Sequence, residues 1–338
     1  MIKSEKRISI AILNYNGENY LKKFLPSIIK YSDKKLSSIY VIDNNSSDDS
    51  ILLIKQKFPS VNIILNKKNY GYAKGYNLGL KKIKSDYIVL INNDVEVTKN
   101  WLLPMFHSME ENNNIGSCQP KILSYENRNL FEYAGAAGGY IDFLGYPYCR
   151  GRIFNTLELD KGQYDSSKEI FWSSGACMMI RNDLFKKLGG FDQIFYAHME
   201  EIDLCWRIKR LGLKNFCFPK SRVYHLGGGT LNYNNPKKTF LNFRNNLIMI
   251  TKNEPLMSII IKLPIRLFLD FFASIYLLIK NKSLIHFLEV IKAYISFILK
   301  LPQLLFKRKN TKMNSIKMNK SIIPLEYYLR GKKRFSDL

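Results

Sequence analysis

Residues 87–94 read YIVLINND and give the clearest indication of fold class in the chain. The run from 87 to 91 is apolar or aromatic throughout, which is typical of a strand buried on both faces of a sheet. Two asparagines and an aspartate follow at once, so polar side chains stand where the strand ends. In open α/β sheets, ligands bind beyond this carboxyl end of the strands.

The first hundred residues repeat this arrangement. Apolar runs predict strands at 8–13, 38–42 and 61–65, and helical patterns predict helices at 21–31, 49–58 and 73–83. Buried strands that alternate with short helices predict an α/β fold with a mostly parallel open sheet flanked by helices. Asn14 and Asp43 also follow strands, so we expect both at the same edge of the sheet as Asp94.

The pattern changes beyond residue 115. Short, glycine-rich strands up to residue 181 predict mixed or antiparallel structure, with a strand at 176–180 and helices at 183–188 and 201–211. After Pro255, long apolar segments carry sparse polar residues at a spacing of three or four, which predicts amphipathic helices with broad apolar faces. The narrow polar stripes are Lys262, Arg266 and Asp270, then His286, Glu289, Lys292, Ser296 and Lys300. The predicted domains are 1–252, an amphipathic helical region at 253–306, and a loosely ordered basic tail at 307–338.

The charge balance restricts the class of protein. The 338 residues include 52 Lys+Arg and 28 Asp+Glu, a net charge of +24, and 46% are hydrophobic, which excludes an acidic or disordered chain. Half of that excess falls in residues 252–338, with 17 basic and 5 acidic residues. Five scattered cysteines do not suit a disulfide framework or a zinc site. The apolar runs at the N-terminus and elsewhere are too short for a signal peptide or a membrane span, which predicts a cytoplasmic chain.

Two aspartates at strand ends allow two interpretations each. Asp94, after Asn92 and Asn93, could hold a divalent cation that bridges two phosphates, because such ions prefer oxygen ligands. The same three residues are also good turn formers. Asp43 could accept a hydrogen bond from a base or a ribose, or it could cap a helix or form a turn.

Glycines recur every fourth residue at Gly71, Gly75 and Gly79. The segment is neither a P-loop nor a dinucleotide-binding fingerprint. Glycines on one helical face allow close packing or close approach of a ligand; packing is favoured for Gly79 and a ligand for Gly71.

Acidic residues and one histidine complete the candidates. Glu200, Glu201 and Asp203 stand at the start of a predicted helix, where carboxylates also simply complement the helix dipole. Three acids within four residues of a basic chain favour a site. His225, before a glycine-rich segment at 227–230 that could move as a flap, is either structural or a ligand for a metal or a phosphate.

Seven motifs in collinear order resemble the family 2 glycosyltransferases with the nucleotide-sugar-binding (A-type) fold, and the rhamnosyltransferase-like members in particular. The resemblance covers about residues 8–250. The motifs lie at 14–16, 43–46, 69–79, 90–94, 174–176, 189–192 and 200–207. Two features depart from the family pattern: the first acid of the metal motif is Asn92, and Glu201 stands where the family has Asp. The Gln-x-x-Arg-Trp motif of processive synthases is absent, which favours transfer of a single sugar.

The resemblance implies a role for each candidate. Asp94 and His225 would hold Mg²⁺ or Mn²⁺ on the donor diphosphate. Glu201 would be the general base, ionised at neutral pH by the helix N-terminus, with Glu200 and Asp203 in support. The implied substrate-binding residues are Asn14, Asn16, Asp43, Asn45, Asn69, Gly71, Lys74, Gly75, Asn77, Asn93, Gly175, Ala176 and Arg207.

The implied reaction is inverting transfer of one sugar, rhamnose or another hexose, from a dTDP- or UDP-sugar in the synthesis of cell-surface polysaccharide. The acceptor would be a hydroxyl of a glycan or of a polyprenyl-diphosphate-linked glycan. The apolar and basic C-terminal region fits an anionic membrane surface, so we expect a peripheral protein on the inner face of the cytoplasmic membrane. The rival interpretation is a basic nucleic-acid-binding protein without transferase activity. The sequence leaves a homodimer open.

Overall fold

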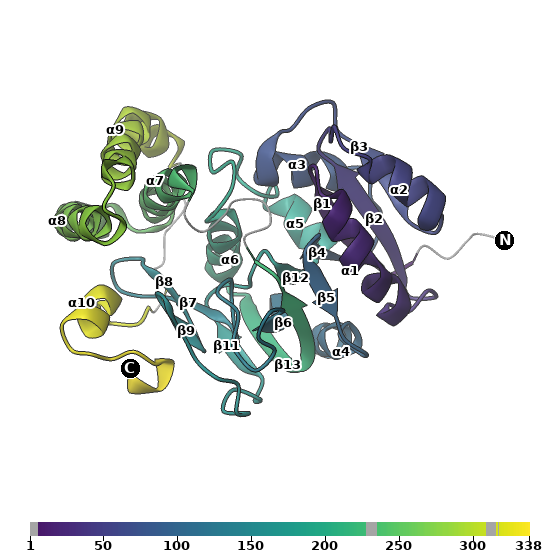
Figure 1. Cartoon of the computed structure of the whole chain (residues 1–338). Coiled ribbons are helices and arrows are strands. Elements are labelled where there is room, and N and C mark those ends of the chain that lie inside the picture. Colours follow the sequence, from purple (N-terminus) through teal and green to yellow (C-terminus); the bar gives the residue numbers. More distant parts are fainter. Residues whose placement is uncertain (1–5, 228–234, 309–315, 317) are drawn as a thin grey trace.

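The computed structural model describes residues 6–227, 235–308, 316 and 318–338, and within them nine strands form a central mixed sheet (Figure 1). Its parallel half has the order β4-β1-β2-β3, with bounds β1 (Ile8–Asn14), β2 (Ser37–Asp43), β3 (Asn62–Leu65) and β4 (Tyr87–Asn92). Because β1 lies between β2 and β4, the chain crosses the sheet after β3. The end of β1 is therefore a topological switch point, where open α/β sheets bind ligands.

The other half of the sheet is mixed. β12 (Cys177–Arg181) pairs antiparallel with β4, and β6 (Ile115–Ser124), β13 (Lys214–His225) and β11 (Lys168–Ile170) follow beyond it. β13 runs parallel to β6 and also pairs with the short β5 (Val95–Val97). The predicted fold class is confirmed, and the predicted strands and helices of the first half differ from the observed bounds by no more than three residues.

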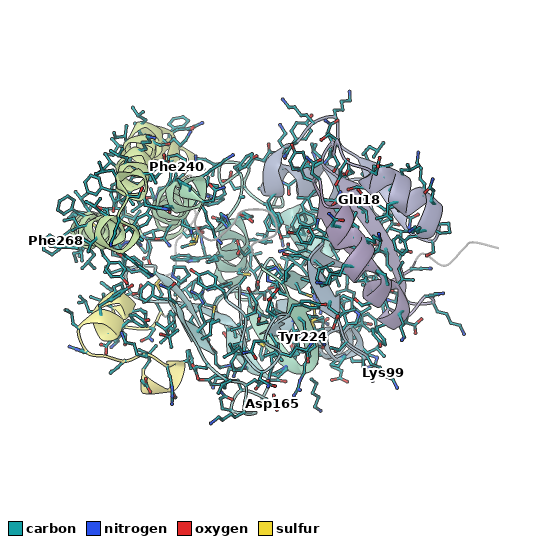
Figure 2. The ribbon with its side chains drawn as sticks, viewed as in Figure 1. Glu18, Lys99, Asp165, Tyr224, Phe240 and Phe268 are labelled. Atoms are coloured by element: carbon teal, nitrogen blue, oxygen red, sulfur yellow. The ribbon has the colours of Figure 1, made fainter. Side chains whose placement is uncertain are left out.

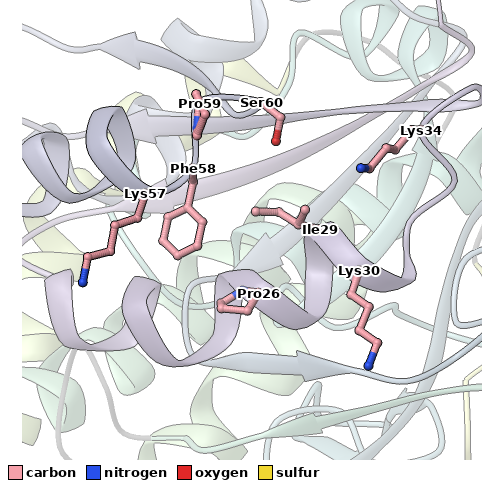
Figure 3. A pocket seen from close by; sticks show the side chains of 8 residues that line it. All are labelled: Pro26, Ile29, Lys30, Lys34, Lys57, Phe58, Pro59 and Ser60. Carbon is pink, nitrogen blue, oxygen red and sulfur yellow. The ribbon is translucent and has the colours of Figure 1, made fainter.

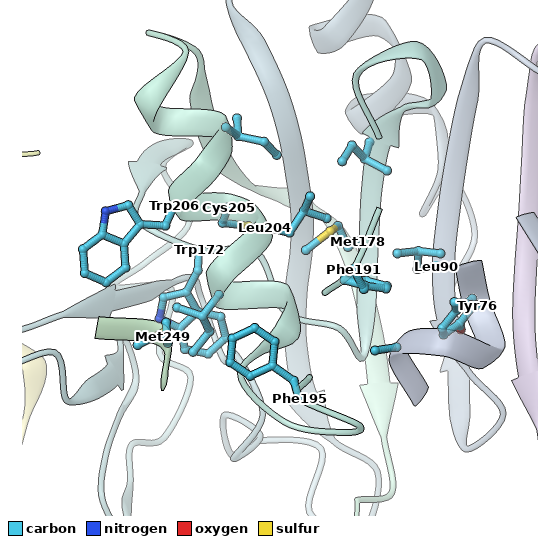
Figure 4. Packing of buried hydrophobic residues seen from close by; sticks show 14 of the residues in the cluster. Tyr76, Leu90, Trp172, Met178, Phe191, Phe195, Leu204, Cys205, Trp206 and Met249 are labelled. Carbon is cyan, nitrogen blue, oxygen red and sulfur yellow. The ribbon is translucent and has the colours of Figure 1, made fainter. Parts of the chain in front are cut away.

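Helices cover both faces of this sheet. They are α1 (Glu18–Tyr31), α2 (Ser50–Lys57), α3 (Gly71–Leu80), α4 (Leu103–Glu111), α5 (Asn182–Lys187) and α6 (Glu200–Arg210). Because side chains alternate along a strand, Ile10 and Ile12 join one buried cluster while Ala11 joins the other. Figure 4 shows the second of these clusters, which runs from Tyr76 of α3 to Trp206 of α6.

A small antiparallel sheet follows β6, as the glycine-rich pattern predicted. Its strands are β7 (Gly139–Ile141), β8 (Pro147–Cys149), β9 (Arg152–Ile153) and β10 (Thr156–Leu157). Residues 318–338, with α10 (Ile323–Tyr328) and a short 3-10 helix (Phe335–Asp337), pack on this sheet. The Phe335 ring centroid lies 5.1 Å from that of Tyr140. The expected loose order of the basic tail is therefore wrong for residues 318–338, because aromatic rings anchor them; residues 309–315 and 317 lie outside the described part.

Three long helices extend the fold: α7 (Pro236–Asn253), α8 (Leu256–Asn281) and α9 (Leu284–Lys307). α9 packs against α7 and α8 against α9. None of the helices in the described ranges is both long and apolar enough to span a membrane.

All five cysteines are buried with free thiols. They lie on five different elements, at Cys118 of β6, Cys149 of β8, Cys177 of β12, Cys205 of α6 and Cys217 of β13.

Candidate active site

Hydrogen bonds join three strand ends at the switch point. The Asn14 amide donates to Asp43 Oδ1 (3.1 Å), and the Asn93 amide donates to Asn14 Oδ1 (3.0 Å). Asp43 Oδ2 accepts from the backbone N–H of Ser46 at 2.9 Å, and the carboxylate is 2% exposed. The turn interpretation of Asp43 is thus what the structure shows, while its contact with a nucleoside stays a prediction.

A second polar cluster surrounds the start of α3. The Asn44 amide, which sequence reasoning missed, donates to the carbonyl of Gly71 (3.0 Å), and Asn69 Oδ1 accepts from the Gly71 N–H (2.9 Å). Gly71 has φ +74°, and a Cβ there would lie 2.6 Å from the ring of Tyr196, so the glycine makes room for that ring. Gly75 gives the same close approach to Asn44. Around this cluster Asn16, Asn45 and Asn69 are exposed and Lys74 is partly exposed, so they can reach a ligand.

Two predicted substrate-binding residues are structural. Asn77 donates to the carbonyl of Phe191 (2.7 Å) and accepts from its N–H (3.0 Å), which uses both ends of the amide. The Arg207 guanidinium donates to Asp203 and to the carbonyls of Leu188 and Gly190 at 2.8 to 2.9 Å. These side chains hold the loop between α5 and α6, and their contact with a substrate stays a prediction.

Asp94 and His225 meet beside the end of β4, because β5 pairs with the last residues of β13. His225 Nε2 lies 3.1 Å from Asp94 Oδ1, and the two residues are 5% and 4% exposed. On the other side of the ring, Nδ1 lies 3.2 Å from Oε2 of the buried Glu132. Burial lowers the pKa of His225, but the carboxylates of Asp94 and Glu132 outweigh it and raise that pKa well above its usual range.

This pair fits a divalent cation. Two neighbouring ligands at about 2.1 Å from an octahedral ion are about 3 Å apart, which matches the 3.1 Å between Asp94 Oδ1 and His225 Nε2. Among the described residues no cluster of three or more His, Cys, Asp or Glu side chains could hold a metal. Such ions are commonly bound by one or two protein ligands together with substrate phosphates, so two ligands suffice for a site that forms with the donor.

The loop before α6 is strained. Tyr196, His198 and Met199 have φ of 63°, 68° and 72°, a left-handed conformation that is costly for such residues and often found at functional sites. Asn245 of α7 holds this loop, because its buried amide donates to the carbonyls of Phe195, Ala197 and His198, each at 2.8 Å. Sequence reasoning missed Asn245, which lies about 50 residues from its partners.

Glu200 and Glu201 follow this loop directly. Glu200 is 3% exposed and Glu201 is partly exposed. A Cβ on Gly175 would lie 2.8 Å from the hydroxyl of Tyr72 and 3.8 Å from Cβ of Glu201, which places Gly175, just before β12, beside Glu201. Ala176 in turn accepts from the N–H of Asn92 (3.0 Å), so this segment joins Glu201 to the strand end that leads to Asp94.

Burial changes the protonation of these acids. It raises the pKa of Glu201 to about 7, and burial together with the neighbouring Glu201 raises the pKa of Glu200 well above its usual range. The sequence predicts that the helix N-terminus holds Glu201 ionised at neutral pH, whereas a pKa of about 7 leaves about half of the groups protonated there. For Asp203, burial raises the pKa, but Lys252 and Arg207 outweigh it and bring the pKa to about 2. Asp203 is fully buried in these ion pairs, so it holds this part of the fold together, and its supporting role in catalysis stays a prediction.

A hollow of about 490 Å³ lies elsewhere, between the last turns of α1 and the segment after α2 (Figure 3). Lys30, Lys34 and Lys57 line it together with Phe58. Because α1 starts at the carboxyl edge of the sheet, its last turn lies toward the opposite edge, away from Asp94 and Glu201.

Comparison with known proteins agrees with this geometry. Residues 9–189 match the sequence profile described as Glycosyl transferase family 2. The chain is 22% identical over 251 residues to the low-salt glycan biosynthesis hexosyltransferase Agl10 of Haloferax volcanii, covering 71% of this chain and 74% of that protein. It is 22% identical over 234 residues to the N-acetylglucosaminyl-diphospho-decaprenol L-rhamnosyltransferase of Mycobacterium tuberculosis, covering 64% and 75%.

Solved structures share the fold. GalNAc-T7 with UDP, GalNAc and Mn²⁺ superposes with a TM-score of 0.57 at 20% identity, over 74% of this chain and 48% of that chain, so this chain spans about half of that protein. S. aureus TarS 1–349 gives a TM-score of 0.56 at 16% identity, over 88% and 81%. The relatives give no support to the nucleic-acid-binding interpretation. The profile covers more than half of the chain, which therefore belongs to glycosyl transferase family 2 and is a glycosyltransferase.

Proposed function

We propose that this enzyme transfers one sugar from a nucleoside diphosphate sugar to a hydroxyl of a glycan, with inversion at the anomeric carbon. The acceptor oxygen forms a bond to that carbon while the bond from the carbon to the diphosphate oxygen breaks, and the hydroxyl proton passes to Glu201. The observation that carries this proposal is that one segment, residues 175–176, lies beside Glu201 and is hydrogen-bonded to Asn92, at the strand end that leads to Asp94. Asp94 and His225 would hold Mg²⁺ or Mn²⁺, which stabilises the charge on a leaving diphosphate when bound.

Exposure favours Glu201 over Glu200 as the base. A base must touch the acceptor, and Glu201 is partly exposed, with its Oε2 buried and without a hydrogen-bond partner, while Glu200 is 3% exposed. With a pKa of about 7, Glu201 is both sufficiently ionised and sufficiently basic at neutral pH. The ionised Glu201 would keep the neighbouring Glu200 protonated, because two close carboxyl groups resist double ionisation.

The relatives suggest the substrates. One is a rhamnosyltransferase named for an acceptor on diphospho-decaprenol, and another is a hexosyltransferase of glycan biosynthesis. We therefore propose a dTDP-rhamnose or UDP-hexose donor and a polyprenyl-diphosphate-linked glycan acceptor in cell-surface polysaccharide synthesis. Screening nucleotide sugars by thermal shift with and without Mn²⁺, followed by transfer assays, tests this. A donor at 100 times its Kd adds about 2.7 kcal/mol to the unfolding free energy. If no nucleotide sugar raises the Tm or is consumed, the proposal is wrong.

Helix α8 is oriented with its polar stripe inward, which suits a membrane surface on its other side. Lys262, Arg266 and Asp270 of α8 are at most 3% exposed. Asp270 accepts from Tyr146 (2.6 Å) and Tyr294 (2.8 Å) and pairs with Arg266 (3.0 Å). Because these bonds fix α8 by its polar side, its apolar side must face outward.

The outer apolar face is large for a chain in water. On α8 it comprises Met257, Ile260, Ile261, Phe268, Phe271, Phe272 and Ile279, which are 47% to 70% exposed; Figure 2 shows Phe268 at the outer edge of the molecule. Leu299 and Phe306 of α9 are 77% and 88% exposed. The exposed Lys280, Lys282 and Lys292 lie among these apolar side chains, which complements an anionic lipid surface. The basic residues Lys307, Arg308 and Lys309 follow in the sequence, and Lys309 lies outside the described residues.

We propose that this face binds the inner surface of the cytoplasmic membrane. The full chain should co-sediment with vesicles of phosphatidylglycerol more than with phosphatidylcholine. High salt should weaken that binding without abolishing it, because each basic residue contributes about 1 kcal/mol. Phe268→Ser with Phe272→Ser should reduce binding, whereas Leu52→Ser, an equally exposed change on α2, should not. Absence of binding, or dimerisation that the same double substitution abolishes, would overturn the proposal. Removal of residues 256–338 is unsuitable as a test, because α9 covers α7.

A further inference from the structure

Glu132 lies against the metal-binding pair and is not among the residues that sequence reasoning selected. It is 3% exposed and belongs to the segment between β6 and the small sheet. The backbone fixes this position: the N–H of Glu132 donates to the carbonyl of Ile122 in β6 at 3.1 Å, and that of Phe131 donates to the carbonyl of Glu158 at 3.0 Å. Its carboxylate accepts from the N–H of Ala134 as well.

His225 is fixed to the same strand. In the parallel pairing of β6 with β13, His225 stands opposite Ser124, and its carbonyl accepts from the N–H of Tyr125 at 2.9 Å. Glu132 and His225 are therefore both held against β6. Glu132 is held by its backbone bond to Ile122, and His225 by the pairing of β13 with β6. This shared support sets the 3.2 Å distance between Oε2 of Glu132 and Nδ1 of His225.

The two nitrogens of His225 have different neighbours. Nε2 faces Asp94, where a cation would bind, and Nδ1 faces Glu132. The contact of Nδ1 with Oε2 of Glu132, at 3.2 Å, is short enough for the carboxylate to accept the Nδ1 proton's hydrogen bond or to pair with the charged ring. A carboxylate that accepts from one nitrogen keeps the proton there, leaves the lone pair of the other nitrogen free for a metal, and fixes the ring plane.

We infer that Glu132 is the positioning residue that orients His225 toward the divalent cation. The inference rests on the proposed metal site of Asp94 and His225. Glu132 itself touches neither the donor nor the cation; it acts through the histidine. Loss of such a second partner typically weakens metal binding by about 10- to 100-fold.

The test is Mn²⁺ binding by the full-length protein, followed through the electron paramagnetic resonance signal of free Mn²⁺. Glu132→Leu should weaken Mn²⁺ binding by about 10- to 100-fold. Glu132→Gln should retain most of the affinity, because its carbonyl oxygen still accepts from Nδ1. Glu158→Gln is the matched control, since Glu158 is also buried, lies in the same region and bonds Tyr164 instead; it should bind Mn²⁺ like the wild type.

The Mn²⁺ dependence of turnover is a second measurement, which distinguishes a role in positioning His225 from a general loss of folded structure. In Glu132→Leu, the Mn²⁺ concentration for half-maximal turnover should rise by the same factor, and kcat at saturating Mn²⁺ should return toward the wild-type value. Should Glu132→Leu not fold, Glu132→Asp withdraws the acceptor by one methylene and should still weaken Mn²⁺ binding. If Mn²⁺ binding is unchanged in Glu132→Leu or Glu132→Asp but lost in His225→Ala, the role of Glu132 is wrong and the proposed metal site stands. Equal Mn²⁺ binding by wild type and Asp94→Asn overturns the proposed metal site, and the role of Glu132 with it.

Discussion

Replacing Glu201 by glutamine should affect turnover and stability in opposite directions. Glutamine keeps the shape of the side chain and removes the base, so kcat should fall by about 10² to 10⁴-fold while donor affinity stays the same. The same change removes a buried charge, so the variant should unfold less readily than the wild type at alkaline pH.

The magnitude follows from the pKa of Glu201, which burial raises from 4.5 to about 7. A rise of about 2.5 units corresponds to about 3.4 kcal/mol, at about 1.36 kcal/mol per unit. Glu201 is partly exposed, so screening by water reduces this to about 2 kcal/mol. A raised carboxyl pKa means that the folded state loses stability as the pH rises from about 4.5 through 7. The gain from glutamine should therefore be present at pH 8 and small at pH 5.

The measurement is thermal unfolding at pH 5 and pH 8 beside turnover with the best donor. Glu201→Gln should raise the Tm by a few degrees at pH 8. Asp203→Asn is the control of opposite sign, because the lowered pKa of Asp203 means that its charge stabilises the fold above pH 4. A Tm that falls or does not depend on pH in Glu201→Gln refutes the reasoning. Normal turnover in Glu201→Gln, with none in Glu200→Gln, would show that Glu200 and not Glu201 is the base.

Four further outcomes are expected. Asp94→Asn should lose most activity and its stimulation by Mg²⁺ or Mn²⁺; full turnover of the wild type in excess chelator would contradict this. The kcat of the wild type should rise with pH to a half-maximum near pH 7, since the base must be ionised, and a flat profile from pH 6 to 8 would speak against Glu201. Asn245→Leu should destabilise by about 1 to 3 kcal/mol and lower turnover, because the carbonyls of Ala197 and His198 lose their donor and that of Phe195 keeps only Arg244; unchanged turnover would show that catalysis does not depend on these bonds. Asp270→Leu leaves Arg266 buried without its partner and should cost about 3 to 5 kcal/mol in denaturant unfolding, whereas Glu289→Leu, whose partner Lys292 is exposed, should cost less than about 1.

The strand ends were predictable from the sequence because they depend on local pattern. An apolar run fixes a buried strand, and the polar residues that follow must then meet at the carboxyl edge. Asn14, Asp43 and Asn93 do so through direct hydrogen bonds. The packing of Gly79 was predictable for the same reason, since a Cβ there would lie 2.5 Å from Ile42.

Long-range partners were not predictable. Asn77 bonds to Phe191, and Arg207 to the loop that starts at Leu188, so the sequence near each residue does not reveal that its polar groups are already used. Periodicity identified a polar stripe on α8 but not which way it faces; that depends on Tyr146 and Tyr294, which offer hydroxyls to Asp270. Glu132 stands between two aromatic residues, and an acid in such a setting was the one local signal that could have revealed it.

Because all five thiols are buried, their reaction with a reagent can report local unfolding of this protein. Burial raises the pKa of Cys118 and Cys177, so the reactive thiolate is scarce while the fold is intact. An alkylating reagent should therefore reach each sulfur only when the surrounding element separates from its neighbours. Because the five cysteines lie on five different elements, their separate labelling rates would give the free energy of local opening in the mixed half of the central sheet, in the small sheet and in α6, without any introduced probe.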